Sequence, residues 1–167
     1  MSKLRRYFLN HQISFLTNVT LDRQPLLVDH VDLFQFAVAS AREQSNFTIV
    51  AWVVLREHFH CVIDAPEENP SEIMRRIKLS FSKRLRNLLG VQAGRVWQYR
   101  FWDHVIRNQN DLNRHIDYVH YNPVKHGYVR SAIEWPHSSF VQYVRDGFYR
   151  PEWGSTGEIS FDGGFGE

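Results

Sequence analysis

The chain is 167 residues long; hydrophobic residues make up 43% of it and charged residues 23%. This composition is typical of a globular domain and excludes a disordered or collagen-like chain, and the length predicts one domain rather than two. No run of about 20 apolar residues predicts a membrane-spanning helix, and the basic N-terminus does not lead into the apolar segment of a secretory signal. The single cysteine, Cys61, excludes an internal disulfide and a four-cysteine zinc site. We therefore expect a cytoplasmic protein with no membrane partner.

Charge is distributed unevenly along the chain. The net charge is +2, but residues 152–167 contain four acidic and no basic residues, which leaves a charge of +6 on residues 1–151. The last segment also holds five of the nine glycines, so we expect one domain over residues 1–151 and a flexible acidic tail that is disordered unless it docks. The basic body suggests a polyanionic partner such as nucleic acid, although a solvated surface accounts for this charge as well.

Hydrophobic periodicity predicts three strands and a helix in the first part of the chain. The predicted elements are a strand over residues 11–20, a helix over 30–44, and strands over 47–55 and 58–64. The segment 47–55 is apolar almost throughout, which predicts a strand covered on both faces. It is separated from the next strand by only Arg56 and Glu57, so the two should form a hairpin.

The second part of the chain predicts two more helices and a short strand. Ser71 should cap a helix over residues 71–89, and Gly90 should end it. The later elements are an aromatic loop over 91–102, a strand over 103–107, a helix from Asn110 or Asp111 to about residue 121, ended by Pro123, and a packed extension over 124–151. The order β-α-β-β-α-β with an added helix predicts an α+β protein of the ferredoxin-like type.

A pair of histidines stands on the strand over residues 58–64. Because side chains alternate along a strand, His58 and His60 share one face, while Phe59, Cys61 and Ile63 share the other. The apolar set should meet the two helices, which leaves the histidines on the opposite face of the sheet. Two imidazoles spaced in this way can bind one divalent metal ion, although hydrogen-bonded histidine pairs without metal are commoner.

The helix that ends near Pro123 carries a candidate nucleophile. Tyr118 and Asn122 are four residues apart and share one helix face. A tyrosine hydroxyl, with an ordinary pKa of about 10, is a weak nucleophile unless it meets a strong electrophile such as a metal-bound phosphodiester. A packing role for Tyr118 is the simpler alternative, and Tyr121 lies nearby on the same helix.

Four segments of the sequence together resemble one known family. They are AWVVLREHFHC at 51–61, WQYRFWDH at 97–104, DYVHYNPVKHG at 117–127 and WPHSSF at 135–140. In this combination and order they resemble the REP-associated tyrosine transposases, bacterial members of the single-tyrosine HUH transposase superfamily, over most of residues 5–150. Many relatives have a proline where this chain has Arg56, a difference that concerns only the shape of the loop before the histidines.

The resemblance implies a DNA transposition enzyme. It implies that His58 and His60 are the HUH histidines, that Tyr118 is the nucleophile, and that Asn122 is the third ligand of a divalent metal, Mg²⁺ or Mn²⁺. The expected reaction is nicking and rejoining of single-stranded DNA at REP hairpins, through a 5′-phosphotyrosine intermediate and a free 3′-hydroxyl. Two other classes stay open at this point: an RRM-like module that binds single strands without catalysis, and a metal-dependent hydrolase that activates water.

Basic residues should supply much of the affinity for DNA. The helix over 71–89 carries six basic residues against Glu72, and its apolar stripe (Ile73, Ile77, Phe81, Leu85) should pack inward. The candidate DNA-binding residues are Arg5, Arg6, Arg75, Arg76, Lys78, Lys83, Arg84, Arg100 and Arg107. Aromatic residues at 97–102 could stack on unpaired bases, although core packing is the commoner fate of Trp97 and Trp102.

Two further expectations concern the tail and the subunit number. A flexible anionic tail beside a cationic cleft would compete with DNA at a high effective concentration; a passive tail that aids solubility is the alternative. Relatives of simple architecture act as swapped dimers, whereas the extension at 124–151 could let the helix with Tyr118 fold back on its own chain. The sequence therefore leaves monomer and dimer open.

Overall fold

The structure, a computed structural model, describes residues 12–157 and 159–167, so the predicted DNA contacts of Arg5 and Arg6 and the tail residue Glu158 lie outside the described residues. Its strands are β1 (Ile13–Val19), β2 (Thr48–Val54), β3 (His58–Asp64) and β4 (Trp102–Val105). Its helices are α1 (Val31–Arg42), α2 (Pro70–Leu89), α3 (Gln109–Lys125) and α4 (Phe140–Arg145), with short 3-10 helices η1 (Leu21–Arg23) and η2 (Ala132–Glu134).

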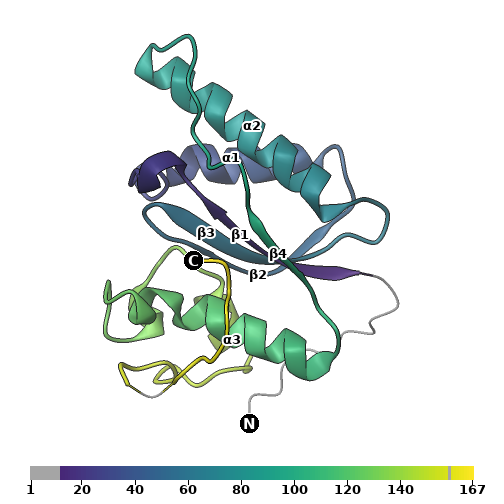
Figure 1. Cartoon of the computed structure of the whole chain (residues 1–167). Coiled ribbons are helices and arrows are strands. Elements are labelled where there is room, and N and C mark those ends of the chain that lie inside the picture. Colours follow the sequence, from purple (N-terminus) through teal and green to yellow (C-terminus); the bar gives the residue numbers. More distant parts are fainter. Residues whose placement is uncertain (1–11, 158) are drawn as a thin grey trace.

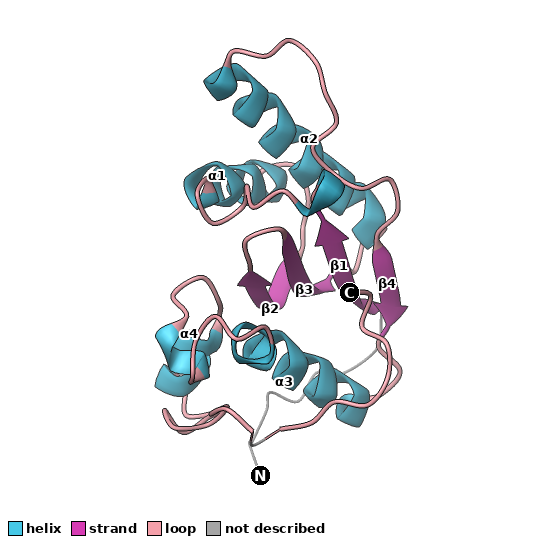
Figure 2. Cartoon of the chain, turned by 60° about the vertical axis from the view of Figure 1, so that its left-hand side comes forward, coloured by secondary structure: helices cyan, strands magenta, loops and turns pink. Residues whose placement is uncertain are grey.

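The four strands form one antiparallel sheet in the order β2-β3-β1-β4. Helices α1 and α2 cover one face of this sheet, and α3 lies across the other face (Figure 1). A second view shows the same three layers, with α4 beside α3 (Figure 2). The prediction of an α+β protein is confirmed. No helix in the described part of the chain is long and apolar enough to cross a membrane.

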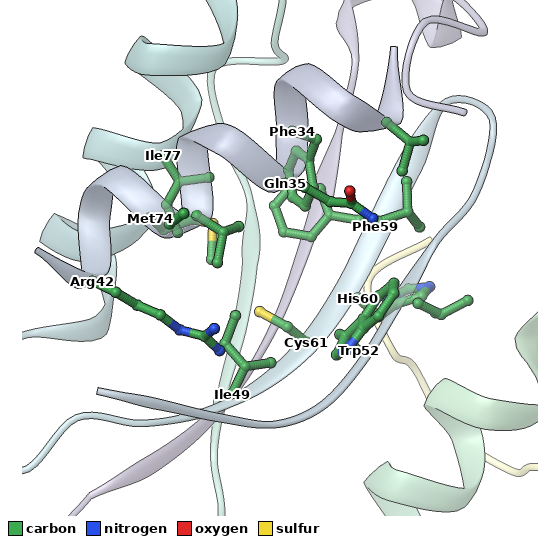
Figure 3. A pocket seen from close by; sticks show the side chains of 15 residues that line it. Phe34, Gln35, Arg42, Ile49, Trp52, Phe59, His60, Cys61, Met74 and Ile77 are labelled. Carbon is green, nitrogen blue, oxygen red and sulfur yellow. The ribbon is translucent and has the colours of Figure 1, made fainter. Parts of the chain in front are cut away.

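The face of the sheet under α1 and α2 is mostly apolar. Phe59, Cys61 and Ile63 of β3 pack in one cluster with residues of both helices, as their alternation predicts. Ile77 of α2 belongs to the same cluster and is 1% exposed. A cavity of about 210 Å³ is lined by residues of α1, α2, β2 and β3, and the sulfur of Cys61 points into it (Figure 3). Burial raises the pKa of the Cys61 thiol to about 12, so this thiol is unreactive.

Helix α2 starts earlier than predicted. Its N-cap is Asn69, not Ser71, because the Asn69 side chain accepts a hydrogen bond from the Ser71 backbone N–H at 2.9 Å. Pro70 then takes the first helical position, where its missing N–H removes no helical hydrogen bond. The predicted end is correct: Gly90 adopts φ 68°, the left-handed conformation that ends helices.

Helix α3 is longer than predicted at both ends. It begins at Gln109, after Asn108, whose side chain accepts from the Asp111 N–H at 2.9 Å. It continues through Pro123 to Lys125, so the prediction that Pro123 ends it is wrong. Proline lacks only its own N–H, and the carbonyls around it remain available. The N–H of His126 bonds to the carbonyl of Asn122 at 3.0 Å, which holds the last turn together.

The acidic tail is docked on the fold in the structure. Trp153 and Phe161 pack against the cluster between the sheet and α3, and Phe165 belongs to that cluster with 6% exposure. The chain end lies close to β1 and β4 (Figure 2). The last residues therefore reach the face of the sheet on which the two histidines were expected.

Candidate active site

Strand β3 places both histidines under α3. The side chains of His58 and His60 are fully buried, and their ring centroids are 4.9 Å apart. Thr17 lies opposite His60 in the β1–β3 register, and its hydroxyl hydrogen-bonds to His60 Nδ1 at 2.7 Å. Glu57 hydrogen-bonds to His58 Nδ1 at 3.2 Å. These contacts occupy one nitrogen of each ring and leave both Nε2 atoms for the site.

Helix α3 brings the two other predicted site residues to the histidines. The ring centroid of Tyr118 lies 5.4 Å from that of His60, and Tyr118 is 1% exposed. Asn122, one turn later, is fully buried. Its Oδ1 has no hydrogen-bond partner within residues 12–157 and 159–167. A buried amide oxygen without a donor is free to bind a cation.

The carboxylate of Glu167, the last residue, occupies the centre of the site. Its Oε1 accepts from Asn122 Nδ2 at 2.9 Å and lies 3.0 Å from His60 Nε2 and 3.8 Å from His58 Nε2. The Tyr118 hydroxyl donates to the same oxygen. The other oxygen accepts from Lys125 Nζ and lies 3.2 Å from His126 Nε2. One anionic oxygen thus lies within 4 Å of a polar atom of the predicted nucleophile and of each predicted metal ligand.

The charges around this carboxylate set the protonation of its neighbours. Burial opposes ionisation of Glu167, but the surrounding side chains of His126, His58, His60 and Lys125 outweigh it and hold the pKa of the carboxyl far below its usual range. Burial also lowers the pKa of His60 to about 4, so its imidazole is neutral at physiological pH. Burial and the Glu167 carboxylate raise the pKa of Tyr118 far above its usual value. With the tail docked, the tyrosine is therefore held protonated.

The residues of this site fit a divalent metal ion. Donor atoms of His58, His60 and Glu167 all lie within 4.8 Å of one another. The unpartnered Asn122 Oδ1 adds an amide oxygen beside the two imidazoles. This set of nitrogen and oxygen donors suits Mn²⁺ and does not exclude Mg²⁺ or Zn²⁺. The histidines thus have the surroundings that a metal site requires, although the metal itself is not fixed by them.

A second cluster of metal-binding residue types lies at the start of α3. It consists of His104, Asp111 and His115. Asp111 already accepts from His104 Nε2 at 2.8 Å and from the Arg107 backbone N–H at 3.0 Å, with the Arg107 side chain also in contact. His115 Nδ1 bonds to the Asp111 carbonyl at 2.8 Å. Its polar groups satisfy one another and fix the connection from β4 to α3.

Helix α2, which carries six of the basic residues, lies on the face of the sheet opposite to α3 (Figure 2). Arg76 is paired with Glu68, Arg75 with Glu72, and Arg84 lies 3.5 Å over the Phe36 ring. The structure places Lys83, Arg100 and Arg107 at the surface, the last beside Asp111. The predicted DNA contacts are thus spread over the surface and are not gathered at the site.

Lys78 borders a groove between α2 and the aromatic loop. Its Nζ lies 5.7 Å from the centroid of the Trp97 ring and 5.3 Å from that of Phe101. Trp97 is 5% exposed and packs in the core, so core packing is the correct alternative for this residue. Tyr99 and Trp102 are 83% and 44% exposed and remain accessible for stacking.

Several members of the site were not predicted from the sequence. Glu167 was counted only as tail charge, and Lys125 and His126 were only part of a matching motif. The one available signal was the charge opposition between tail and body, which predicted an anion at a cationic cleft but not which carboxylate. Thr17 gave no signal, because a threonine in a strand is common.

Comparisons with known proteins agree on one family. The model of the family "Transposase IS200 like" matches residues 10–122. A REP-associated tyrosine transposase of Escherichia coli is 38% identical, with 92% of this chain and 91% of the relative covered. A Haemophilus influenzae protein described as a REP-associated tyrosine transposase is 34% identical, with 98% and 99% covered. A solved REP-associated tyrosine transposase bound to a REP hairpin matches with a TM-score of 0.81 and 35% identity, covering 100% of this chain and 98% of the other.

Proposed function

Because the chain belongs to the family of IS200-like transposases, we propose that it nicks and rejoins single-stranded DNA at REP hairpins through a 5′-phosphotyrosine on Tyr118. The chemistry is a metal-dependent strand transfer of the kind used in DNA transposition. The substrate assignment follows the solved relative, whose structure was obtained with a REP hairpin. Residues 1–151 form the catalytic domain, residues 152–167 are its acidic tail, and the site of action is the cytoplasm.

One observation carries this proposal. The Tyr118 hydroxyl, Asn122 Nδ2 and His60 Nε2 all contact a single oxygen of the Glu167 carboxylate. A carboxylate oxygen resembles a nonbridging phosphate oxygen in charge and in hydrogen bonding. A phosphodiester in the same place would meet the nucleophile and the predicted metal ligands together, which is the arrangement that in-line attack requires.

The residues of the site then have separate roles. His58, His60 and Asn122 would hold Mg²⁺ or Mn²⁺, which supplies Lewis-acid stabilisation of the phosphate. The Tyr118 oxygen releases its proton to solvent and forms a bond to phosphorus, while the bond from phosphorus to the 3′-oxygen breaks and that oxygen takes up a proton from solvent to leave as a free hydroxyl. Lys125 Nζ, 3.0 Å from the Tyr118 hydroxyl, stabilises the negative charge on the attacking oxygen. Rejoining is the reverse reaction with another 3′-hydroxyl.

The two alternative classes are less well supported by the site. An RRM-like module binds bases on exposed aromatics of its sheet, whereas here that face carries buried histidines beneath α3. A water-activating hydrolase has no need of a tyrosine beside the metal ligands. Since all of these side chains come from one polypeptide, the site supports a nuclease that needs no residue from a second subunit.

A denaturing gel of the protein with an end-labelled single-stranded REP oligonucleotide and Mn²⁺ tests the proposal. Wild type should give a covalent adduct that disappears with a chelator. Tyr118→Phe should lower adduct formation by at least about a thousandfold, with DNA affinity within a few fold, because only the hydroxyl is removed. The matched control is Tyr121→Phe, which changes a buried neighbour. Cleavage without an adduct would indicate a hydrolase, and binding without cleavage a binding module.

A further inference from the structure

The tail places an aromatic ring beside the nucleophile as well as a carboxylate at the histidines. The ring of Phe165 stacks on that of Tyr118, with centroids 3.8 Å apart and an angle of 10° between the planes. Phe15 and His115 meet Phe165 edge-on, at 6.0 Å and 5.2 Å. The Arg114 guanidinium lies 5.4 Å from its centroid. We name the space that these four residues form around Phe165 the aromatic slot.

The chain between the slot and the histidines is fitted to this position. The Thr17 hydroxyl, which also contacts His60, donates to the Phe165 carbonyl at 2.8 Å. Gly166 adopts φ +79°, and a Cβ at this position would lie 2.1 Å from the Trp102 side chain. Only glycine fits at this backbone position. The sequence Phe-Gly-Glu therefore holds a flat ring and an anion at a fixed spacing.

We propose that the aromatic slot binds the nucleobase next to the scissile phosphate when residues 165–167 withdraw. This inference rests on the proposed function and adds to it a base subsite. Glu167 must leave the histidines before a phosphate can bind there, and Phe165 is then drawn out with it. Two residues of extended chain span at most about 7 Å, so one nucleotide can reach from the slot to the metal ligands.

The walls of the slot suit a base better than an aliphatic side chain. The Tyr118 ring offers one flat face, and the Arg114 guanidinium can stack or attract an aromatic ring through a cation–π contact. Bases stack on such surfaces with little dependence on sequence. The slot therefore positions the strand at the cleavage point and leaves sequence recognition to other contacts.

Binding to abasic oligonucleotides tests the slot without requiring catalysis. The protein is the full chain with Tyr118→Phe, which keeps the ring and blocks cleavage, combined with Phe165→Ala, which removes the occupant. Fluorescence anisotropy is measured with REP hairpin oligonucleotides that carry one abasic site at successive positions. We expect one position beside the cleavage point to lose about 5- to 100-fold in affinity, and distant single-stranded positions to change less than twofold. A 2-aminopurine at the sensitive position should be quenched on binding.

Two arginine variants in the same background assign the effect to the slot. Arg114→Gln should reduce the loss of affinity that the abasic site causes at the sensitive position. The reason is that this variant no longer has the guanidinium on which the base would stack. Arg130→Gln, which changes another exposed arginine beyond the end of α3, should leave this loss unchanged. Equal weakening of intact and abasic DNA by Arg114→Gln would mean that Arg114 contacts phosphate, and would overturn its part in the slot.

The outcomes separate this inference from the proposed function. If the wild type forms the adduct but an abasic site lowers affinity equally at every position, the base subsite is overturned and the proposed function stands. The aromatic slot would then bind only Phe165. No adduct from the wild type would overturn the proposed function, and the anisotropy profile would still test the slot. Restoring Phe165 in the Tyr118→Phe protein should lower affinity several-fold for intact DNA and less for the sensitive abasic DNA. The same decrease for both would contradict the proposal.

Discussion

Helices cover both faces of the sheet, yet the side chains that β3 presents to the two faces differ in polarity. Towards α1 and α2, strand β3 presents Phe59, Cys61 and Ile63 to an apolar cluster. Towards α3, the same strand presents His58 and His60 to polar partners. Alternation along one seven-residue strand thus separates the residues that stabilise the fold from those that we propose to bind phosphate and metal.

The difference shows which buried polar groups need a functional explanation. Burying polar side chains is unfavourable unless they are hydrogen-bonded, and the α1–α2 face is mostly apolar, with Ser14 and Asn18 of β1 among its buried polar side chains. The α3 face contains His58, His60 and Asn122, each fully buried. Even with the tail docked, Asn122 Oδ1 has no partner among the residues that the structure describes. A fold selected for stability alone would place apolar residues here.

Two substitutions at neighbouring positions of β3 should separate stability from activity, since one should lower the free energy of unfolding and the other the cleavage rate. Phe59→Ala should lower the free energy of unfolding by about 3–5 kcal/mol, because it leaves a cavity under α1 and α2. His60→Ala should change stability by less than about 1.5 kcal/mol but lower Mn²⁺-dependent cleavage at least about a hundredfold. Urea denaturation and the cleavage assay measure the two quantities. Full cleavage by folded His60→Ala would remove His60 from the site.

Asp117 tests whether every buried polar group of the α3 layer serves the reaction. Burial raises its pKa to about 6, against the opposing hydrogen bond from Tyr149. A carboxyl with a raised pKa destabilises the fold when ionised, fully above pH 6 and not at all below its unfolded pKa of 3.8. Asp117→Asn should therefore stabilise the protein by about 2–3 kcal/mol at pH 8, with the gain declining towards zero at pH 4.

The measurement for Asp117→Asn is denaturant unfolding of variant and wild type across this pH range. The control is the cleavage rate at a temperature where both proteins are folded. This rate should be the same for the two proteins, because the hydrogen bond of the Asp117 carboxylate is to Tyr149 and not to the histidines or Tyr118. A gain in stability that is the same at pH 4 and pH 8 would show that ionisation of Asp117 is not the cause.

The tail adds an anion to the polar face and should inhibit. Glu167→Gln removes the charge that the histidines and Lys125 stabilise, so we expect cleavage and single-strand affinity to rise about three- to tenfold, most clearly at low salt. Glu152→Gln is the control, because Glu152 is an exposed tail residue away from the site. An equal gain from both variants would favour general charge competition over the specific contact. Deleting residues 152–167 is a poorer test, since it also removes packed Trp153 and Phe165.

The smallest effect concerns the outer surface of α2. Lys78 has no carboxylate partner among the residues described, whereas Arg76 is paired with Glu68. If the groove beside Lys78 carries single-stranded DNA, Lys78→Ala should reduce the slope of log affinity against log salt by about 0.7. Arg76→Ala should reduce it less. Unchanged slopes in both variants would move the DNA path to other basic residues, such as Arg100.

Much of the fold follows from local patterns in the sequence. The strand over 58–64 and the end of α2 at Gly90 were predicted correctly, because alternation and a left-handed glycine are local signals. The errors also have local causes. Asn69 and Ser71 are both good caps, and the backbone geometry decides between them. Pro123 is tolerated inside α3 because the turn around it is buried and holds by other hydrogen bonds.

The site was predictable only where its members belong to a motif. His58, His60, Tyr118 and Asn122, which the resemblance named, lie together around Glu167, and their roles stay a prediction. Glu167 meets His60 across 107 positions of sequence, and no periodicity links a glycine-rich tail to a strand. The aromatic slot is equally non-local, since Phe15, His115 and Phe165 come from a strand, a helix and the tail. Contacts of this kind depend on the tertiary structure and not on spacing.

The short connection from β4 to α3 has a consequence for how the protein responds to dilution. Only residues 106–108 separate β4 from α3, so α3 returns across the sheet of its own chain and completes the site in one molecule (Figure 1). Assembly of the site is then a first-order event that occurs once, during folding. The rate of adduct formation per molecule, with DNA in excess, should stay constant as protein concentration falls, whereas a site shared between two chains would lose rate as its subunits dissociate. We therefore expect a single copy of this chain to carry out the proposed reaction without a second subunit.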